Sequence, residues 1–358
     1  MASNNGSNGL VQATRPVINI VGRDDPALSA NLVSLLVAED TQGLYRCEAG
    51  FGNWGNSGNG LDFLYFDRKT LDFGKAFQVK IGTDVFFDGR IMALEGQFLR
   101  DVSPQLVVLA EDRFQDLRMT RRSRSFADTD DAGVFNQVAS EHGLSAQVNV
   151  HGPTHRLLAQ VNLSDLAFLR ERARAIDAEV WVSGTTLYAQ SHTARGGTAY
   201  QIRYKQALRE FSVLADLANQ RTSVTVGGWD VARKAAIAHQ ADDSLLAGEL
   251  NGDASGSSVL SQALGARAET LAHTAPLTDQ EAQAQAESYF KIAARRFVVG
   301  RGLADTDIRL RAGNFVTIQG LGPLFSGKYY LTAVNHLYDG VQGLRTEFTA
   351  ERPGLGKV

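Results

Sequence analysis

Cysteine is almost absent from this sequence. Cys47 is the single cysteine among 358 residues, so the chain can form neither an intrachain disulfide nor a metal site built from several cysteines. A lone thiol is typical of proteins made in a reducing compartment. Whatever stabilises the fold must therefore come from packing, hydrogen bonds and ion pairs.

The sequence also lacks a strong charge of either sign. Lysine and arginine together number 36, against 39 aspartate and glutamate residues, for a formal net charge of −3. Such a balance provides no basic field for nucleic acid or for an anionic membrane surface. The composition therefore requires no nucleic-acid partner.

An export signal and a long apolar run are missing too. The first residues, MASNNGSNGLVQATRP, contain no basic segment followed by an apolar one, and so are not a signal peptide. No apolar run approaches the roughly 20 residues needed to span a bilayer. We expect a disordered segment over 1–14, synthesis in the cytoplasm without a signal peptide, and no stable membrane insertion.

Two glycine-rich stretches imitate nucleotide-binding loops. Gly50–Gly55 fits G-x-G-x-x-G, but the helix-breaking residues 56–60 follow where a dinucleotide site needs a helix. Gly322–Lys328 imitates a phosphate-binding loop, but Tyr329 occupies the position of the Mg²⁺-binding Ser or Thr. The first stretch is better interpreted as a β-loop and the second as a turn between strands.

Candidate metal-binding and catalytic motifs lack the residue spacing that such sites require. Asp128–Asp131 would need a glutamate where Ala139 stands to form a calcium loop, and helix capping is the better interpretation. His151 and His155 are four residues apart, but Pro153 between them disrupts the helix that would align their rings. We expect no metal, no cofactor and no catalytic residues, although carboxylate pairs distant in sequence stay open.

Hydrophobic patterning predicts a β-rich α+β chain. Short alternating runs separated by turn residues predict strands in both halves, at a spacing that favours a sandwich or barrel. The middle segment predicts helices that lead into strands. The expected division is a first β-domain over 15–118, an α+β module over 119–198, a second β-domain over 199–240 and 297–358, and an insertion over 241–296.

Capping residues place the helices. Asp128–Asp131 precedes a predicted helix over 132–142, and Ser164 precedes a second helix followed by a hairpin around Ser183–Gly184. The buried stripe expected on that second helix comprises Leu166, Leu169, Ala173 and Ile176.

The insertion combines a loose segment with one helix. Residues 241–276 are rich in Ala, Ser, Gly and Asp and show little periodicity, so we expect a mobile segment that either orders on assembly or is a plain flexible insertion. Thr278 and Glu281 form a capping box. The helix that follows is expected to bury Ala282, Ala286, Tyr289, Ala293 and Phe297.

Arginines supply the candidate contact residues. One dense basic run lies at the junction of the first β-domain and the module. It is either a solvated linker or a set of interdomain ion pairs, or it contacts a phosphate group or a partner. The helix after Ser164 adds charged residues, including Arg172, that we expect to face solvent or a partner. The candidate partner-contact residues are Arg118, Arg121, Arg122, Arg124, Arg170 and Arg174.

Several stretches together resemble a known family. Glu48–Trp54 (EAGFGNW), Asp67–Gly74 (DRKTLDFG) and Val85–Leu94 (VFFDGRIMAL) stand in the order seen in the phage late control protein D family. Gln160–Ala173 (QVNLSDLAFLRERA) is similar to one of that family's recognisable segments. Residues 311–330 resemble the second barrel of the same family and of VgrG spike proteins.

The resemblance, which covers about 15–352, implies the central hub of a contractile-tail or injection-system baseplate. It implies a homotrimer in which each subunit contributes two tail-tube-like β-barrels, so that three chains adapt a hexameric inner tube to a trimeric spike. Because VgrG continues into further domains and this chain ends at Val358, the spike is expected to be a separate protein. Baseplate wedge proteins are further implied partners, and a virion tail or injection particle is the implied location.

Two alternatives remain from other functional classes. One is a glycan- or cell-surface-binding baseplate module without the geometry of a hub. The other is a baseplate cell-wall hydrolase, which would require a cleft with clustered carboxylates or histidines.

Overall fold

A computed structural model describes residues 15–357 except 59, 232 and 273–275. The expected disordered segment 1–14 lies outside these residues. The chain divides into two compact units, which we call unit 1 and unit 2. Unit 1 comprises the described part of 1–37 together with 46–111 and 336–345, and unit 2 comprises 38–45, 112–335 and 346–357. The predicted division into segments is finer than these units and stays a prediction.

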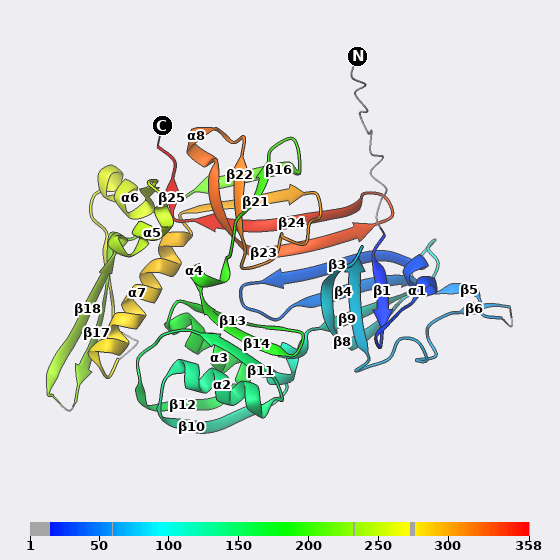
Figure 1. The fold of residues 1–358 in the computed structure, drawn as a ribbon, viewed down its shortest axis with the longest axis horizontal. Helices are drawn as coiled ribbons and strands as arrows, with labels where there is room; N and C mark the ends of the chain where they lie inside the picture. The colour runs from blue at the N-terminus through cyan, green and yellow to red at the C-terminus, as the bar shows by residue number, and fades with distance from the viewer. Residues whose placement is uncertain (1–14, 59, 232, 273–275, 358) are drawn as a thin grey trace, which may run out of the picture. The chain divides into compact units, whose positions relative to one another are not determined.

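Unit 1 is a sheet with the strand order β3-β4-β9-β8-β7-β1-β2 (Figure 1). The paired strands within β4-β9-β8-β7-β1-β2 are antiparallel. A separate two-stranded hairpin, β5–β6, and the short helix α1 complete the unit. The bounds are β1 Val17–Ile20, β2 Arg23–Asp24, α1 Pro26–Ala30, β3 Leu32–Asp40, β4 Arg46–Gly52, β5 Trp54–Asn56, β6 Leu61–Phe63, β7 Ala76–Ile81, β8 Asp84–Gln97 and β9 Gln105–Glu111.

Alternating side chains give the sheet of unit 1 its buried face. In β9, Leu106, Val108 and Ala110 are buried and the residues between them are partly exposed. This period of two places one face on the core. Phe51 and Phe77, from β4 and β7, are fully buried. The alternating sequence pattern therefore predicts the buried side chains of these strands correctly.

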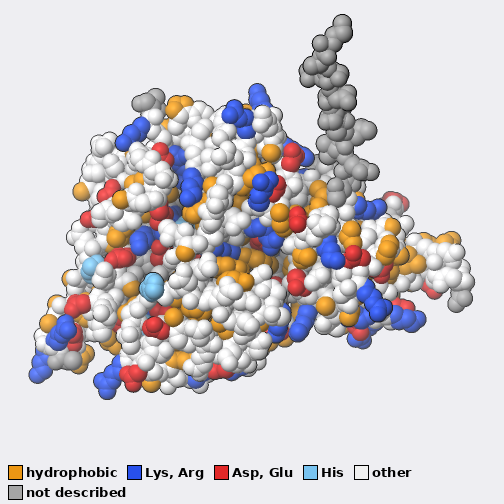
Figure 2. All heavy atoms as spheres, in the orientation of Figure 1, with side chains coloured by type: hydrophobic (Ala, Val, Ile, Leu, Met, Phe, Trp, Pro, Cys, Tyr) orange, Lys and Arg blue, Asp and Glu red, His pale blue; other side chains and the backbone are white. Residues whose placement is uncertain are grey.

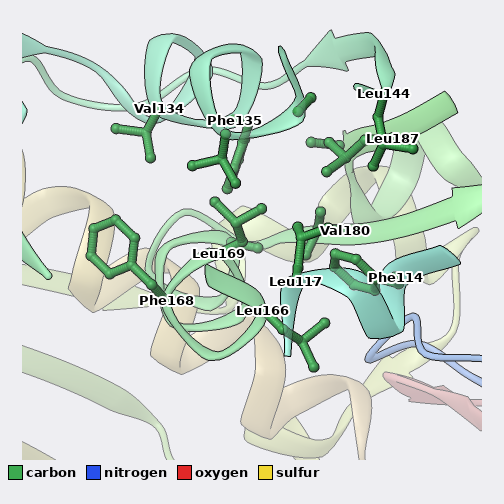
Figure 3. Close-up of a cluster of buried hydrophobic side chains, with 14 of the residues drawn as sticks. Phe114, Leu117, Val134, Phe135, Leu144, Leu166, Phe168, Leu169, Val180 and Leu187 are labelled. Atoms are coloured by element: carbon green, nitrogen blue, oxygen red, sulfur yellow. The ribbon is translucent and has the colours of Figure 1, made fainter. Parts of the chain in front are cut away.

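Unit 2 begins with an α+β module. Its helices α2 and α3 share one core with η1, the β10–β12 pair and the β11-β14-β13 sheet. Figure 3 shows Val134 and Phe135 of α2 facing Leu169 of α3. The bounds are η1 Arg113–Leu117, β10 Arg121–Thr129, α2 Asp131–Glu141, β11 Ser145–Asn149, β12 His155–Ser164, α3 Asp165–Ala175, β13 Ala178–Ser183, β14 Thr186–Ser191 and α4 His192–Arg195.

The helix caps in this module are those predicted. The Asp130 side chain accepts a hydrogen bond from the Gly133 amide, and the Ser164 hydroxyl accepts one from the Ala167 amide. The predicted hairpin is also present, since Gly184 has a φ of +57° in the turn between β13 and β14. Local capping and turn chemistry were sufficient to place these elements.

Unit 2 also contains a run of strands in the order β16-β21-β24-β23, with β22 pairing to β23 and β15 pairing to β22. Its core includes fully buried Tyr329, Val316 and Leu331. The bounds are β15 Tyr200–Arg203, β16 Leu208–Ala215, β21 Val298–Ala304, β22 Phe315–Gln319, α8 Gly322–Phe325, β23 Gly327–Asp339, β24 Gly343–Arg352 and β25 Gly354–Leu355.

The expected barrels are not supported. A β-rich fold with antiparallel sheets is confirmed, but no sheet among the described residues closes into a barrel. In unit 2 the terminal strands β15 and β16 share one isolated bridge, between Tyr204 and Leu208, in place of a ladder. The sequence pattern predicts strands and their buried faces. Closure of a sheet into a barrel depends on pairing between strands far apart in the chain, which the pattern does not reveal.

The insertion contains more regular structure than its composition suggested. Helix α7 packs on the β18-β17-β20 sheet through one core, and β19 pairs with β25 (Figure 1). Mobility of the segment stays a prediction. The bounds are β17 Ser223–Asp230, β18 Ala235–Asp242, η2 Asp243–Leu246, α5 Ala247–Leu250, β19 Ala254–Ser255, α6 Gly256–Leu264, β20 Ala268–Leu271 and α7 Asp279–Arg295.

The buried face of α7 differs from the prediction by a rotation. Ala282 and Ala286 are buried as expected, and the Thr278 side chain caps the helix. Phe290 and Ala294 continue the buried row at a spacing of four, while Tyr289 is 41% exposed. Phe290 carries no hydroxyl and takes the core position, whereas the Tyr289 hydroxyl lies 3.5 Å from Oε1 of Glu269.

Candidate assembly interface

The basic run divides into paired and exposed arginines. Arg122 and Arg124 in β10 both contact Asp165 at the start of α3, at 3.3 and 2.8 Å, and the His142 ring lies 2.8 Å from the same carboxylate. Burial would raise the pKa of Asp165, but hydrogen bonds from His142 and Gln160 and the two arginine charges hold this pKa below its ordinary value. This cluster ties the β10–β12 pair to α3.

The other candidate arginines lie nearer to solvent. Arg118 and Arg121 are exposed, and Arg174 is exposed near the end of α3. The Arg170 Nε donates a 2.7 Å hydrogen bond to the Gln42 carbonyl. The structure thus gives Arg122 and Arg124 a role inside the module, and a partner contact by any of the six stays a prediction.

Arg172 was expected to face solvent or a partner, and this is wrong. Its Nε lies 2.6 Å from Oδ1 of the fully buried Asp131, and its guanidinium lies 3.0 Å from the His155 ring. His155 also contacts Glu281 of α7 at 2.7 Å. The side chain turns inward because a buried carboxylate on α2 requires a cation.

A second buried network centres on Arg295 of α7. This side chain is 3% exposed and ion-pairs with Asp177, which follows α3, and with Glu249 of α5. The carboxylates hold the pKa of the guanidinium above its ordinary value although burial opposes the charge. Its pair with Asp177 and the contact between His155 and Glu281 hold α7 against the module.

A groove of about 770 Å³ lies alongside α7 in unit 2. Residues from the end of α3, from α7 and from β16, β20 and β21 line it. Three apolar side chains in its lining are open to solvent: Leu214 at 64%, Tyr289 at 41% and Ile292 at 36% exposed. An apolar lining of this kind marks a surface that another molecule can cover.

Polar groups in the groove lack partners. Arg174 and Arg296 are exposed, and neither has an ion-pair partner among the described residues. The Oε1 atom of Gln285 is buried in the wall without a hydrogen-bond donor from the described part of the chain. A buried acceptor left unpaired is costly. The groove lining also contains the exposed carboxylates of Glu171 and Asp216.

Unit 1 carries an exposed aromatic cluster on the β5–β6 hairpin. Trp54 and Phe63 pack edge to face at 5.2 Å, and Phe63 lies 4.9 Å from Phe66 and 6.1 Å from Phe98. Trp54 is 46% exposed, Phe63 39% and Phe98 64%. Figure 2 shows hydrophobic side chains on the surface next to this hairpin. We call the hairpin with Phe98 the aromatic arm.

Within the described residues, no group of three or more His, Cys, Asp or Glu side chains could hold a metal ion. No helix in that part of the chain is both long and apolar enough to cross a membrane.

A family model described as the Alg8 N-terminal domain matches residues 58–339, which is most of the chain. The chain belongs to the Alg8 N-terminal domain family. A search of curated proteins finds no match.

Solved structures share the fold of this Alg8 N-terminal domain. The 43 kDa tail protein of prophage MuSo2 from Shewanella oneidensis is similar with a TM-score of 0.70 at 10% identity, over 95% of this chain and 98% of that one. A tail protein from Neisseria meningitidis MC58 has a TM-score of 0.69 at 12% identity, over 96% and 97%. The E. coli c3393 protein, a component of the type VI secretion system, has a TM-score of 0.58 at 10% identity, over 95% and 79%.

The assignment to the late control protein D and VgrG family is therefore wrong. One of the stretches that suggested it, Glu48–Trp54, lies outside the range that the Alg8 N-terminal domain matches. The others are capped helices and glycine-rich strand turns, which recur in related β-rich folds and do not separate one family from another.

Sequence reasoning missed both the groove and the aromatic arm. Tyr289 was assigned to the core, and the stretch containing Trp54 was interpreted only as a β-loop. One available signal was the density of aromatics at Trp54, Phe63 and Phe66 around a glycine-rich turn. No local signal could have shown the groove, because its walls come from segments far apart in the sequence.

Proposed function

We propose that the chain is a structural subunit of a tail or type VI-like baseplate, a homotrimeric hub that adapts a hexameric inner tube to a trimeric spike. The observation that carries this proposal is the fold shared with a prophage tail protein and a second tail protein over nearly the whole length of both chains. A likeness over 95% or more of this chain leaves little of it for a separate catalytic domain.

The architecture of each unit supports a ring. Unit 1 and unit 2 each contain one run of hydrogen-bonded strands, so three copies contribute six such runs. This number matches a six-fold tube on one face, while the three chains match a three-fold spike on the other. The two tube-like barrels of the proposal would then be completed by strands of neighbouring copies, because no sheet closes into a barrel among the described residues.

The remaining parts of the proposal concern partners. The inner tube, a separate spike protein and wedge proteins are the expected neighbours, and Arg118, Arg121, Arg170 and Arg174 are the candidate contacts among the predicted arginines. The α+β module, anchored by buried ion pairs, would keep its position while these contacts form.

Co-purification tests this function. The chain is co-expressed with the tube and spike proteins of the same particle, with a tag on the spike. We expect the tube and the spike to be recovered together only when this chain is present. Recovery of tube and spike together without it, or loss of this chain from the complex, would contradict the adaptor role.

A further inference from the structure

One carboxylate in unit 2 lies between two cavities without a partner of its own. Glu351 of β24 is partly buried and lines a cavity of about 460 Å³ and a second one of about 210 Å³. Within the described part of the chain it forms no hydrogen bond and no ion pair, and the charges of neighbouring groups act on it from a distance. An ionised carboxylate in such a place is costly unless a cation pairs with it.

Charged and titratable groups from several elements line the same two cavities. The cations are Arg170 and Arg174 of α3, Arg295 and Arg296 of α7, Lys328 of β23 and Arg352 of β24. The other titratable groups are Asp40 of β3, Asp177 after α3, Glu179 of β13, His192 of α4, Glu249 of α5 and Tyr330 of β23.

Most of the cations are engaged elsewhere or lie at the surface. Arg352 pairs with Asp253 at 3.0 Å, and Arg170 donates to the Gln42 carbonyl. The exposed cations are Arg174, Arg296 and Lys328. A surface cation gives up its hydration when it enters a cavity, which weakens the pair that it can form there.

Arg295 is the buried cation for which Glu351 can compete. Its guanidinium is 3% exposed and is shared by Asp177 and Glu249. Nε and Nη2 donate to Glu249 at 2.8 and 2.7 Å, while Nη1 and Nη2 donate to Asp177. A guanidinium has five N–H donors, so one hydrogen on Nη1 is left for a further acceptor.

Glu249 is the partner that can give way. It belongs to α5, a helix of four residues, none of which is buried. Glu351 is on β24, which pairs with β21 on one side and with β23 on the other. A central strand keeps its side chain in place, whereas a short helix without buried residues opens locally at low cost in free energy.

We propose that Glu351 is a proton-operated switch for α5. With its proton, Glu351 is neutral and Arg295 holds Glu249, which is the arrangement in the structure. Without its proton, the Glu351 carboxylate binds Arg295 in place of Glu249, and α5 is released. The switch acts within one copy of the chain and goes beyond the proposed assembly, on which it does not depend.

The surroundings of Glu351 place the switch near neutral pH. Burial raises the pKa of its carboxyl to about 7; the charges of Glu179 and Glu249 add to this shift, and those of Arg295 and Arg296 oppose it. Because this pKa is raised above the ordinary value of 4.5, the stabilisation is complete below about pH 4.5. It is lost as pH rises through about 7.

Hydrogen exchange of the full chain, measured by mass spectrometry at about pH 6 and about pH 8, tests the switch. After correction for the intrinsic rate, we expect exchange in α5 to increase on the order of tenfold between these pH values. Glu351→Gln should keep it low at both. The matched control is Glu347→Gln, at an exposed position on the same strand, which should behave like the unmodified chain.

Denaturant unfolding supplies an independent readout. Glu351→Gln should flatten the fall in stability between about pH 5 and about pH 8, since the other titratable groups are common to both proteins. The same pH profile in both proteins would overturn the proposal. A flattened profile with exchange in α5 that is independent of pH would also overturn it, because a surface cation such as Arg296 then neutralises Glu351 in place of Arg295.

Discussion

The Nδ1 atom of His155 lies 2.7 Å from the Oε1 atom of Glu281, although 126 residues separate them in the sequence. His155 begins β12 of the α+β module, and Glu281 is in the first turn of α7. Asp131 and Arg172 contact the other ring nitrogen, at 3.7 and 3.0 Å. A titratable group thus joins the module to the inserted helix.

Stability should fall as pH rises through the raised pKa of His155. Burial and Arg172 oppose protonation, but hydrogen bonds to Asp131 and Glu281 outweigh them and raise the pKa of the imidazole. The stabilisation is complete below the unfolded value of about 6.5 and is lost as pH rises through the raised pKa. Urea unfolding across this range should show the loss, and His155→Gln should remove it. The same slope in both proteins would contradict this.

Breaking the buried Arg295 pairs should be strongly destabilising. Asp177→Ala leaves a guanidinium that is 3% exposed with one carboxylate partner instead of two. Loss of one partner of a buried pair costs about 3–5 kcal/mol of unfolding free energy. Denaturant unfolding measures this change.

The matched control for Arg295 is an exposed pair. Arg209 and Asp305 form an ion pair with side chains 43% and 57% exposed. Asp305→Ala should cost less than about 1 kcal/mol, because solvent screens such pairs. Equal losses from Asp177→Ala and Asp305→Ala would show that burial does not set the strength of the Arg295 network.

The module core should be sensitive to cavities. Leu169 of α3 is fully buried, and Figure 3 shows it facing α2 across the core. Leu169→Ala should reduce the unfolding free energy by about 2–5 kcal/mol, while Leu157→Ala, at a position 60% exposed, should change it little. Thermal unfolding of both variants checks the difference, and similar midpoints would count against the assigned core.

Two of the predicted arginines should separate stability from assembly. Arg124→Ala removes contacts to Asp165, Gln160 and Glu141, so it should lower the unfolding midpoint. Arg174→Ala removes an exposed charge beside the groove, so it should weaken association and leave the midpoint nearly unchanged. Calorimetry and light scattering on both variants test this, and the reverse pattern would contradict it.

The sequence predicts helix ends and turns well because each depends on contacts between residues close together in the chain. Ser164 and Asp130 cap their helices through single hydrogen bonds, and a turn glycine at 184 closes a hairpin. The predicted buried face of α7 is partly wrong. Tyr289 and Phe290 are adjacent aromatic residues, and only packing against the partner sheet determines which of them is buried.

Long-range pairing explains the larger errors. Whether β15 and β16 close a barrel, and whether Arg172 turns toward Asp131, depend on segments brought together by the fold. Family assignment failed for a related reason, because capped helices and strand turns are shared by several tail-protein folds. The groove beside α7 is likewise a product of tertiary structure and has no sequence motif.

The native mass of the assembly tests the central claim most directly. Multi-angle light scattering on the chain with its tube and spike partners, together with image averages of the same sample, gives copy number and symmetry. The hub account predicts three copies of this chain in a three-fold ring with the tube on one face and the spike on the other. A monomer, or a ring with another number of copies in the presence of both partners, would contradict it.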